Sequence, residues 1–246
     1  MGFRIFMHSV TLVLNQLGGA LRISGVLYIA SLLVSLLSFF FFAQSTMTEA
    51  APPWPTIILG IVIGFLYLWI AVAWHRFVLV DEMPQTLLPP LHGDRMAAYF
   101  GRSVLMLLVI LALIIVLGFI NGIIIVATNG APVALVLTTL LLIFVTLVLS
   151  YRLAPMFPAA AIGRTLGLRD AWAATAGANG TIVALALISA VASVAVDLPV
   201  YVFQAIPGGV IIAFLWTAVT GWFKLLIGVS ILTTLYGVFV EKRQIA

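Results

Sequence analysis

The stretch SYRLAPMFPAAAIGRTLGLRDAWAATAGANGT, residues 150–181, is the only long polar interruption in the second half of this sequence. An apolar run ends at Arg152, a segment bounded by prolines follows, and a short helix is predicted around Trp172. A Gly-Ala-Asn-Gly turn then leads into the next apolar run. The stretch therefore predicts an elbow, residues 151–180, between two membrane spans.

A second stretch in the first half of the chain has the same plan. His75 and Arg76 end one apolar run, three prolines break the chain, and Gly93 begins a short predicted helix before the next apolar run. Because a proline lacks the N–H that a helix interior needs, these positions favour a loop. A second elbow is therefore predicted at residues 75–102.

The composition requires that the segments around these elbows lie in lipid. Of 246 residues, 64% are hydrophobic and 7% charged, and the mean hydropathy is +1.30, which leaves too little polar surface for a water-soluble globule. About 20 apolar residues span a bilayer as a helix, and six such runs are predicted: Ile23–Ala43, Thr56–Trp74, Ser103–Ala127, Val133–Tyr151, a fifth from Thr181 to Val196 or Phe203, and Trp222–Val240. We expect an all-α polytopic membrane helix bundle, a single membrane domain over residues 1–246.

Residues 1–22 are predicted to form an amphipathic helix ahead of the first span. The apolar side chains repeat every three or four residues, while polar side chains keep the same spacing on another face. We call the apolar set the N-terminal stripe: Phe3, Phe6, Val10, Leu14 and Leu17. The helix is expected to lie in the membrane interface, and docking into a groove of a partner protein is the alternative.

The last apolar stretch is longer than one span requires. We interpret Val210–Gly221 as an interfacial or re-entrant helix, with inclusion in the sixth span as the alternative, and this places Lys224 at the outer interface. Elsewhere, two pairs of glycines stand four residues apart, Gly60 with Gly64 and Gly118 with Gly122. These pairs are interpreted as close helix packing inside the monomer.

The distribution of basic residues predicts the orientation. Both ends and both elbows carry ten of the eleven Lys and Arg residues, and only Lys224 falls elsewhere. The excess of positive charge on the cytoplasmic side of membrane proteins predicts that both termini are cytoplasmic. Because these charges are spread over short loops and not gathered on a soluble domain, a nucleic-acid partner is not expected.

Asp197 and Lys224 are the charged residues expected within the outer half of the bundle. One hypothesis is that they form an ion pair between the fifth and sixth spans and gate a polar path with Asn121 and Gln204. The alternative is that both lie at the interface, either solvated or as a structural pair. The absence of a charge at the centre of any span, as the spans are drawn above, argues against transport.

The cytoplasmic elbows supply the remaining candidates. Arg152, Arg164 and Arg169 are candidate contacts for anionic lipid headgroups. His75 and Arg76 are interpreted as interface anchors. The acidic and histidine residues of the first elbow match no compact ligand motif, so no metal site is expected.

The sequence shows no catalytic constellation or phosphate-binding loop, so neither catalysis nor a cofactor is expected. There are also no cysteines, which excludes disulfides and thiolate chemistry.

Several phrases of the sequence, taken together, resemble YciC-like bacterial inner-membrane proteins. They are Asn15 with LRIS at 21–24, RLAP at 152–155, and Leu168 with Ala171-Trp172 and Gly177-Ala178-Asn179. They are also similar to the membrane domain fused to some glycerophosphodiester phosphodiesterases, although this chain has no such catalytic domain. The resemblance implies a six-helix inner-membrane protein and supplies no catalytic residue.

The sequence therefore predicts a non-catalytic inner-membrane protein. We expect an accessory or scaffold factor that docks on a membrane complex or organises lipid through its interfacial helices, with membrane lipids and a membrane-protein complex as its partners. A small transporter or channel that uses Asp197 and Lys224 is the alternative.

Overall fold

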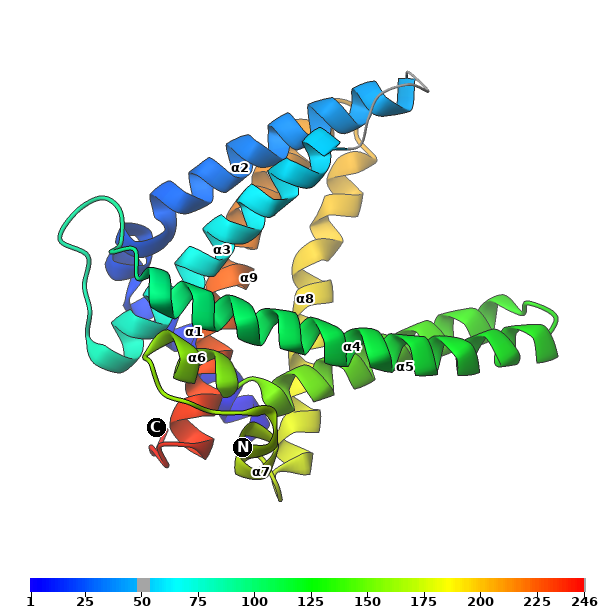
Figure 1. The fold of residues 1–246 in the computed structure, drawn as a ribbon. Helices are drawn as coiled ribbons and strands as arrows, with labels where there is room; N and C mark the ends of the chain where they lie inside the picture. The colour runs from blue at the N-terminus through cyan, green and yellow to red at the C-terminus, as the bar shows by residue number, and fades with distance from the viewer. Residues whose placement is uncertain (48–53, 246) are drawn as a thin grey trace.

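The computed structural model describes residues 1–47 and 54–245, and within these ranges every regular element is a helix (Figure 1). The elements are α1 (Gly2–Asn15), α2 (Leu17–Met47), α3 (Trp54–Val80), α4 (Gly93–Ala127), α5 (Pro132–Leu153), α6 (Met156–Ala161), α7 (Leu168–Ala174), α8 (Asn179–Gln204) and α9 (Gly209–Phe239). Six of them, α2, α3, α4, α5, α8 and α9, are long and apolar enough to cross a membrane. The predicted class is confirmed, and the chain is a multi-pass integral membrane protein.

The six long helices form three antiparallel hairpins, α2–α3, α4–α5 and α8–α9 (Figure 1). The hairpins meet at the end of the molecule where α1, α6, α7 and both termini lie. From there the α4–α5 hairpin points away from the other two, so its far half stands apart from the rest of the bundle. Helix α5 nevertheless packs against α8 at the end where the hairpins meet.

Two of the hairpin turns depend on residues that adopt positive φ. Asn129 and Gly130, at φ 50° and 71°, close the turn between α4 and α5, and Gly208, at φ 76°, precedes the first residue of α9. Glycine and asparagine adopt this conformation at the lowest steric cost. Both turns are thus formed by the residues best suited to them.

The central helix of the fold is α9, which the sequence analysis divided into two pieces. Its polar side chains bind α3 inside the bundle: the indole N–H of Trp74 donates to the Ser230 hydroxyl at 2.8 Å, and Nδ1 of His75 lies 2.8 Å from the Thr233 hydroxyl. All four side chains are buried. In an apolar medium such bonds hold particular helix faces together, because an unpaired polar group there is costly.

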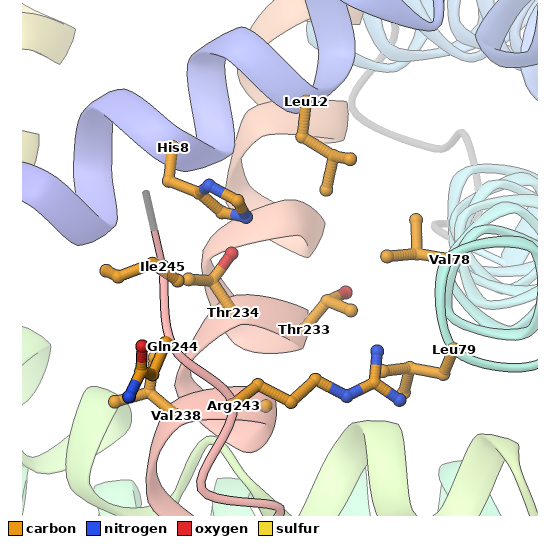
Figure 2. Close-up of a pocket in the computed structure, with 11 residues that line it drawn as sticks. His8, Leu12, Val78, Leu79, Thr233, Thr234, Val238, Arg243, Gln244 and Ile245 are labelled. Atoms are coloured by element: carbon orange, nitrogen blue, oxygen red, sulfur yellow. The ribbon is translucent and has the colours of Figure 1, made fainter.

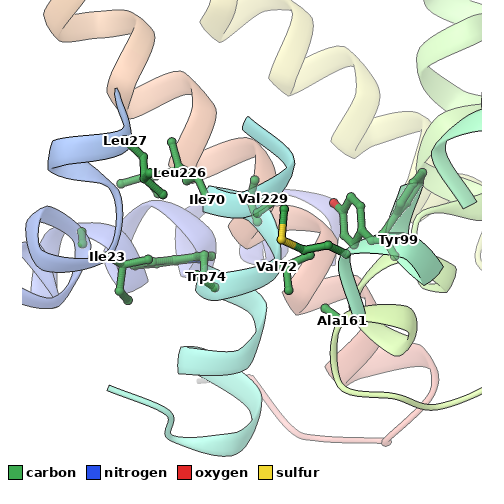
Figure 3. Packing of buried hydrophobic residues seen from close by; sticks show 14 of the residues in the cluster. Ile23, Leu27, Ile70, Val72, Trp74, Tyr99, Ala161, Leu226 and Val229 are labelled. Atoms are coloured by element: carbon green, nitrogen blue, oxygen red, sulfur yellow. The ribbon is translucent and has the colours of Figure 1, made fainter. Parts of the chain in front are cut away.

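The same helix also binds α2 and α1. The indole N–H of Trp222 donates to the Ser24 hydroxyl at 2.8 Å, and the hydroxyls of Thr234 and Ser9 lie 3.1 Å apart. Around these bonds, apolar side chains of α2, α3 and α9 fill the core shown in Figure 3, and among them are Ile23, Leu27, Ile70, Leu226 and Val229. Helices α1, α2 and α3 are therefore all joined to α9, which is distant from them in sequence.

The boundary between the first two helices differs from the prediction. The amphipathic helix predicted over residues 1–22 ends at Asn15, and α2 begins at Leu17. A Cβ on Gly2 would lie 2.6 Å from the carbonyl oxygen of Thr181, so the backbone of α1 closely approaches the start of α8. This packing turns α1 onto the bundle and separates it from the span that follows.

One other predicted boundary was wrong, and one that the sequence left open is now placed, because continuous helices run through both positions. The short helix expected at Gly93 and the span expected from Ser103 are one helix, α4. The fifth span, whose end was ambiguous in the sequence, runs through Pro199 to Gln204 as α8. One interior proline removes a single backbone bond, which a membrane helix tolerates.

The predicted break between Val210–Gly221 and Trp222–Val240 was also wrong. Helix α9 runs without interruption from Gly209 to Phe239. Gly221 is instead a contact point, because a Cβ there would lie 2.7 Å from the Tyr28 hydroxyl, which donates to the carbonyl oxygen of Ala218 at 2.8 Å.

This contact predicts that Gly221→Ala destabilises the protein although alanine is the better helix former. We expect a loss of about 1 kcal/mol, because the new methyl displaces Tyr28 and its hydrogen bond. Gly228→Ala, on the same helix with nothing within 4 Å of its Cβ position, is the matched control and is expected to stabilise by about 0.5–1 kcal/mol. Thermal unfolding in mild detergent measures both, and equal shifts would contradict the contact.

The two elbows form one joined layer, which the sequence treated as separate. All six residues of α6 are buried, so this part of the stretch described as a polar interruption is a core element and does not lie at a polar surface. Helix α6 packs against α3 and α4, and Nη1 of Arg76 in the first elbow donates to the carbonyl oxygen of Ala161 at 3.2 Å.

Candidate functional sites

The predicted charge pair between the fifth and sixth spans is present. Nζ of Lys224 on α9 donates to Oδ1 of Asp197 on α8 at 2.7 Å, and the two side chains are 37% and 41% exposed. Because α9 is continuous, Lys224 does not lie near the outer end of a span as predicted. Lys224 is the sixteenth of 31 residues, about 22 Å from either end at 1.5 Å per residue. The expectation that no span has a central charge was therefore wrong.

The polar path expected around this pair is not assembled. Asn121 lies toward the far end of α4, in the hairpin that points away from α8 and α9 (Figure 1), and Gln204 is exposed at the end of α8. The pair's polar neighbour is instead Trp216, whose indole N–H donates to the carbonyl oxygen of Val196 at 2.9 Å. Both interactions join α8 to α9, as expected for a structural pair.

The three arginines expected at lipid headgroups differ in their surroundings. The Arg152 guanidinium lies 4.5 Å from the centre of the Trp172 ring, which connects the end of α5 to α7. Arg164 donates to the Tyr236 hydroxyl and to the Glu241 carboxylate, both at 3.0 Å. Only Arg169 is exposed without a partner within the part of the chain that the structure describes.

The N-terminal stripe remains accessible in the folded protein. Phe3, Leu14 and Leu17 are 60%, 49% and 39% exposed, and the other two members are half-buried. The sequence analysis missed the opposite stripe, which packs against α8 and α9: Gly2, Ile5, Ser9 and Val13. The three-to-four-residue spacing was available as a signal, but small residues that permit close packing are hard to distinguish from a polar face.

His75 is the clearest correction among the elbow residues. The sequence interpreted it as an interface anchor, but its side chain is 0% exposed, bonded to Thr233 and 3.4 Å from the Tyr99 hydroxyl. It is a core residue between α3, α9 and α4. Arg76, the next residue, forms an ion pair that closes the loop between α3 and α4.

That ion pair is part of a cluster of three side chains, Arg76, Glu82 and His92. Arg76 donates through Nε to Glu82 Oε2 at 2.8 Å, and His92 Nε2 lies 2.5 Å from Glu82 Oε1. Burial alone would raise the pKa of Glu82, but the hydrogen bonds from Arg76 and His92 outweigh it and hold the pKa below its ordinary value of 4.5.

A lowered carboxyl pKa predicts a pH dependence of stability. The contribution of Glu82 is fully present above pH 4.5 and is lost as the pH falls through the lowered pKa of the folded state. Glu82→Gln is therefore expected to cost up to about 1 kcal/mol at pH 7 and less at pH 3. Unfolding measured over this range checks it, with Asp81→Asn as the neighbouring carboxylate control. A cost for Glu82→Gln that persists unchanged at pH 3 would contradict the assignment.

Within residues 1–47 and 54–245 no group of three or more His, Asp or Glu side chains is arranged to hold a metal ion. His92 and Glu82 do meet, but as partners of Arg76.

Comparisons with known proteins give no relative from which a role could be transferred. No protein-family model, curated protein or solved structure matches this chain. The resemblance to YciC-like proteins stays a prediction.

Proposed function

We propose that the protein is a non-catalytic accessory or scaffold factor of the membrane that packs against a membrane-spanning helix of another protein. The observation that carries this proposal is the position of the α4–α5 hairpin, whose far half stands apart from α8 and from α2–α3 (Figure 1). In the 18-residue apolar stretch that could cross a membrane, 6% of the residues of α4 and 0% of those of α5 are buried. A hairpin with so few neighbours in its own chain is suited to receiving another helix.

The glycine pairs support a helix as the occupant. The expectation that they pack inside the monomer was wrong, because nothing lies within 4 Å of the Cβ positions of Gly118 and Gly122, or of Gly60 and Gly64. A pair of small residues one turn apart lets a second helix backbone approach closely, and helix association in lipid depends on such packing. On α4 this accessible pair is flanked by exposed Phe119, at 73%.

The test is site-specific photo-crosslinking in native membranes, with the crosslinker at position 119 on α4 and, as control, at position 211 on α9. Ile211 is 69% exposed and faces no glycine pair. We expect one defined protein adduct from position 119 and none from position 211. Mass spectrometry of the adduct then identifies the partner.

A double variant tests whether the glycine pair itself forms the contact. Gly118→Leu with Gly122→Leu is expected to abolish the adduct, whereas Gly101→Leu, an exposed glycine on the same helix with open space around it, keeps it. An adduct of twice the mass of the chain would show pairing of two copies and defeat the proposal. Lipid adducts alone would also defeat it.

The orientation and location belong to the same proposal. Both termini, α6 and α7 lie at one end of the bundle (Figure 1). The termini and the two elbows at this end also carry ten of the eleven basic residues, which supports a cytoplasmic position for it. The resemblance to YciC-like proteins supports the bacterial inner membrane as the location.

A transporter or channel is the second candidate, and the central position of Lys224 is the observation in its favour. The lack of an assembled polar path around Asp197 and Lys224 makes it the weaker one.

A further inference from the structure

A cavity of about 240 Å³ lies at the end of the bundle that carries both termini (Figure 2). It is enclosed by α1, the last turn of α3, the last turns of α9 and the C-terminal tail. The tail is held in place because Arg4 of α1 donates to the carbonyl oxygen of Ile245 at 2.6 Å. Its volume equals that of about eight water molecules at about 30 Å³ each, which is room for a small headgroup.

The lining of the cavity divides into an apolar wall and a few polar groups. The wall is formed by Leu12, Val78, Leu79, Val238 and Ile245. Figure 2 shows the His8 ring pointing into the space from α1 and the Arg243 guanidinium reaching across it toward Leu79. Mostly apolar walls with few convergent polar groups are typical of ligand sites.

The two basic side chains have hydrogen-bonding capacity to spare. The His8 ring has no hydrogen-bond partner among the described residues. Arg243 uses Nε to bind the Glu241 carboxylate at 2.6 Å, and its two terminal nitrogens have no partner in the same part of the chain. The Thr233 and Thr234 hydroxyls are already bonded to His75 and Ser9.

The charge around the cavity is positive. None of the eleven lining residues is acidic, and the neighbouring Glu241 is shared between Arg243 and Arg164. Arg4, bonded to the carbonyl oxygen of Ile245, adds a further positive charge at the tail. An anion with an apolar continuation fits such a site, because the guanidinium forms charge-assisted bonds to phosphate oxygens while the apolar wall contacts hydrocarbon.

We propose that this cavity binds the phosphate of an anionic phospholipid, with Arg243 and His8 as its ligands and the lipid chains along Leu12, Val78 and Leu79. The site lies at the basic end of the bundle, where anionic headgroups are attracted to basic pockets between helices. It is separate from the glycine face of α4, so the two proposals can fail independently. The sequence-predicted arginines are not its ligands.

Binding is tested on the full chain in mild detergent by native mass spectrometry, with phosphatidylglycerol, phosphatidylcholine and soluble glycerol 1-phosphate as probes. We expect one phosphatidylglycerol to be retained in preference to phosphatidylcholine. His8→Gln with Arg243→Gln should weaken it at least about tenfold. Lys242→Gln, adjacent in sequence but absent from the lining, and Arg169→Gln should leave it unchanged.

A second variant tests the cavity without changing any charge. Gly237→Val adds bulk to the lining, where the nearest atom to the new Cβ is Cδ of Arg243 at 3.6 Å, and it should also reduce binding. Unchanged affinity in both variants would overturn the site. Glycerol 1-phosphate bound as tightly as the lipid would overturn the lipid as its ligand and leave a site for free phosphate esters.

Discussion

Trp74→Ala is expected to lower the free energy of unfolding by about 3 kcal/mol, the largest effect of any substitution considered for this chain. Trp74 is 0% exposed, fills the junction of α2, α3 and α9 (Figure 3), and is bonded to Ser230. The value is at the lower end for deleting a buried aromatic side chain, because the unfolded chain in detergent keeps its apolar groups out of water and mainly packing is lost.

Helix α3 provides a matched control. Trp54, its first residue, is 59% exposed, and Trp54→Ala is expected to cost less than about 0.5 kcal/mol. Trp74→Phe keeps most of the volume and loses the bond to Ser230, which is worth about 1 kcal/mol or less in a membrane protein.

The absence of native cysteines permits a direct measurement of these effects. With Ala186→Cys as the background, at a position that is 0% exposed, unfolding is followed by thiol labelling. Equal losses at the two tryptophans would contradict the placement of Trp74.

Neutralising one member of the pair between α8 and α9 is expected to destabilise the protein more than neutralising both. Asp197→Asn leaves Lys224 without a counter-ion at the middle of α9, and Lys224→Met leaves the carboxylate alone. Each single variant should cost about 2 kcal/mol, since an unpaired charge in the hydrocarbon layer is expensive. The double variant removes both charges and should cost less than about 1 kcal/mol.

The same variants separate the two candidate functions. Under the accessory proposal, the double variant keeps the partner adduct formed from position 119. Under the transport alternative it folds but abolishes flux through reconstituted vesicles. Lys242→Met, an exposed lysine beyond α9, is the control for loss of a positive charge. If both single variants and the double variant keep the stability of the native protein, the pair contributes nothing to the fold.

The charge pair illustrates how far the sequence could be interpreted. Charges are rare in apolar runs, so pairing Asp197 with Lys224 required only that the last two spans be neighbours, which a short connection ensures. Placing Lys224 along its helix was wrong, because the last apolar stretch is longer than one span needs and was divided after Gly221. Whether a glycine interrupts a helix or admits a neighbour depends on what lies beside it, here the Tyr28 hydroxyl.

The packing partners were beyond prediction for a related reason. In a soluble helix the buried face is the apolar one, but most of these helices are apolar all round, so hydropathy does not separate a packed face from a lipid-facing one. His75 followed an apolar run and was assigned to the interface. Its true environment depends on Thr233, 158 residues away in sequence.

By itself, the sequence determined that the chain has six segments long and apolar enough to cross a membrane, where the polar elbows interrupt them, and that Asp197 and Lys224 could pair, because these depend on hydropathy and local composition. The tertiary structure alone decided that α9 is central, that α1 packs on α8, that the α4–α5 hairpin stands apart, and that His8 and Arg243 share a cavity. These depend on close contacts and single hydrogen bonds between residues up to 241 positions apart, such as Arg4 and Ile245. Every apolar helix face is about equally stable against lipid, so only those specific contacts select one arrangement of the helices.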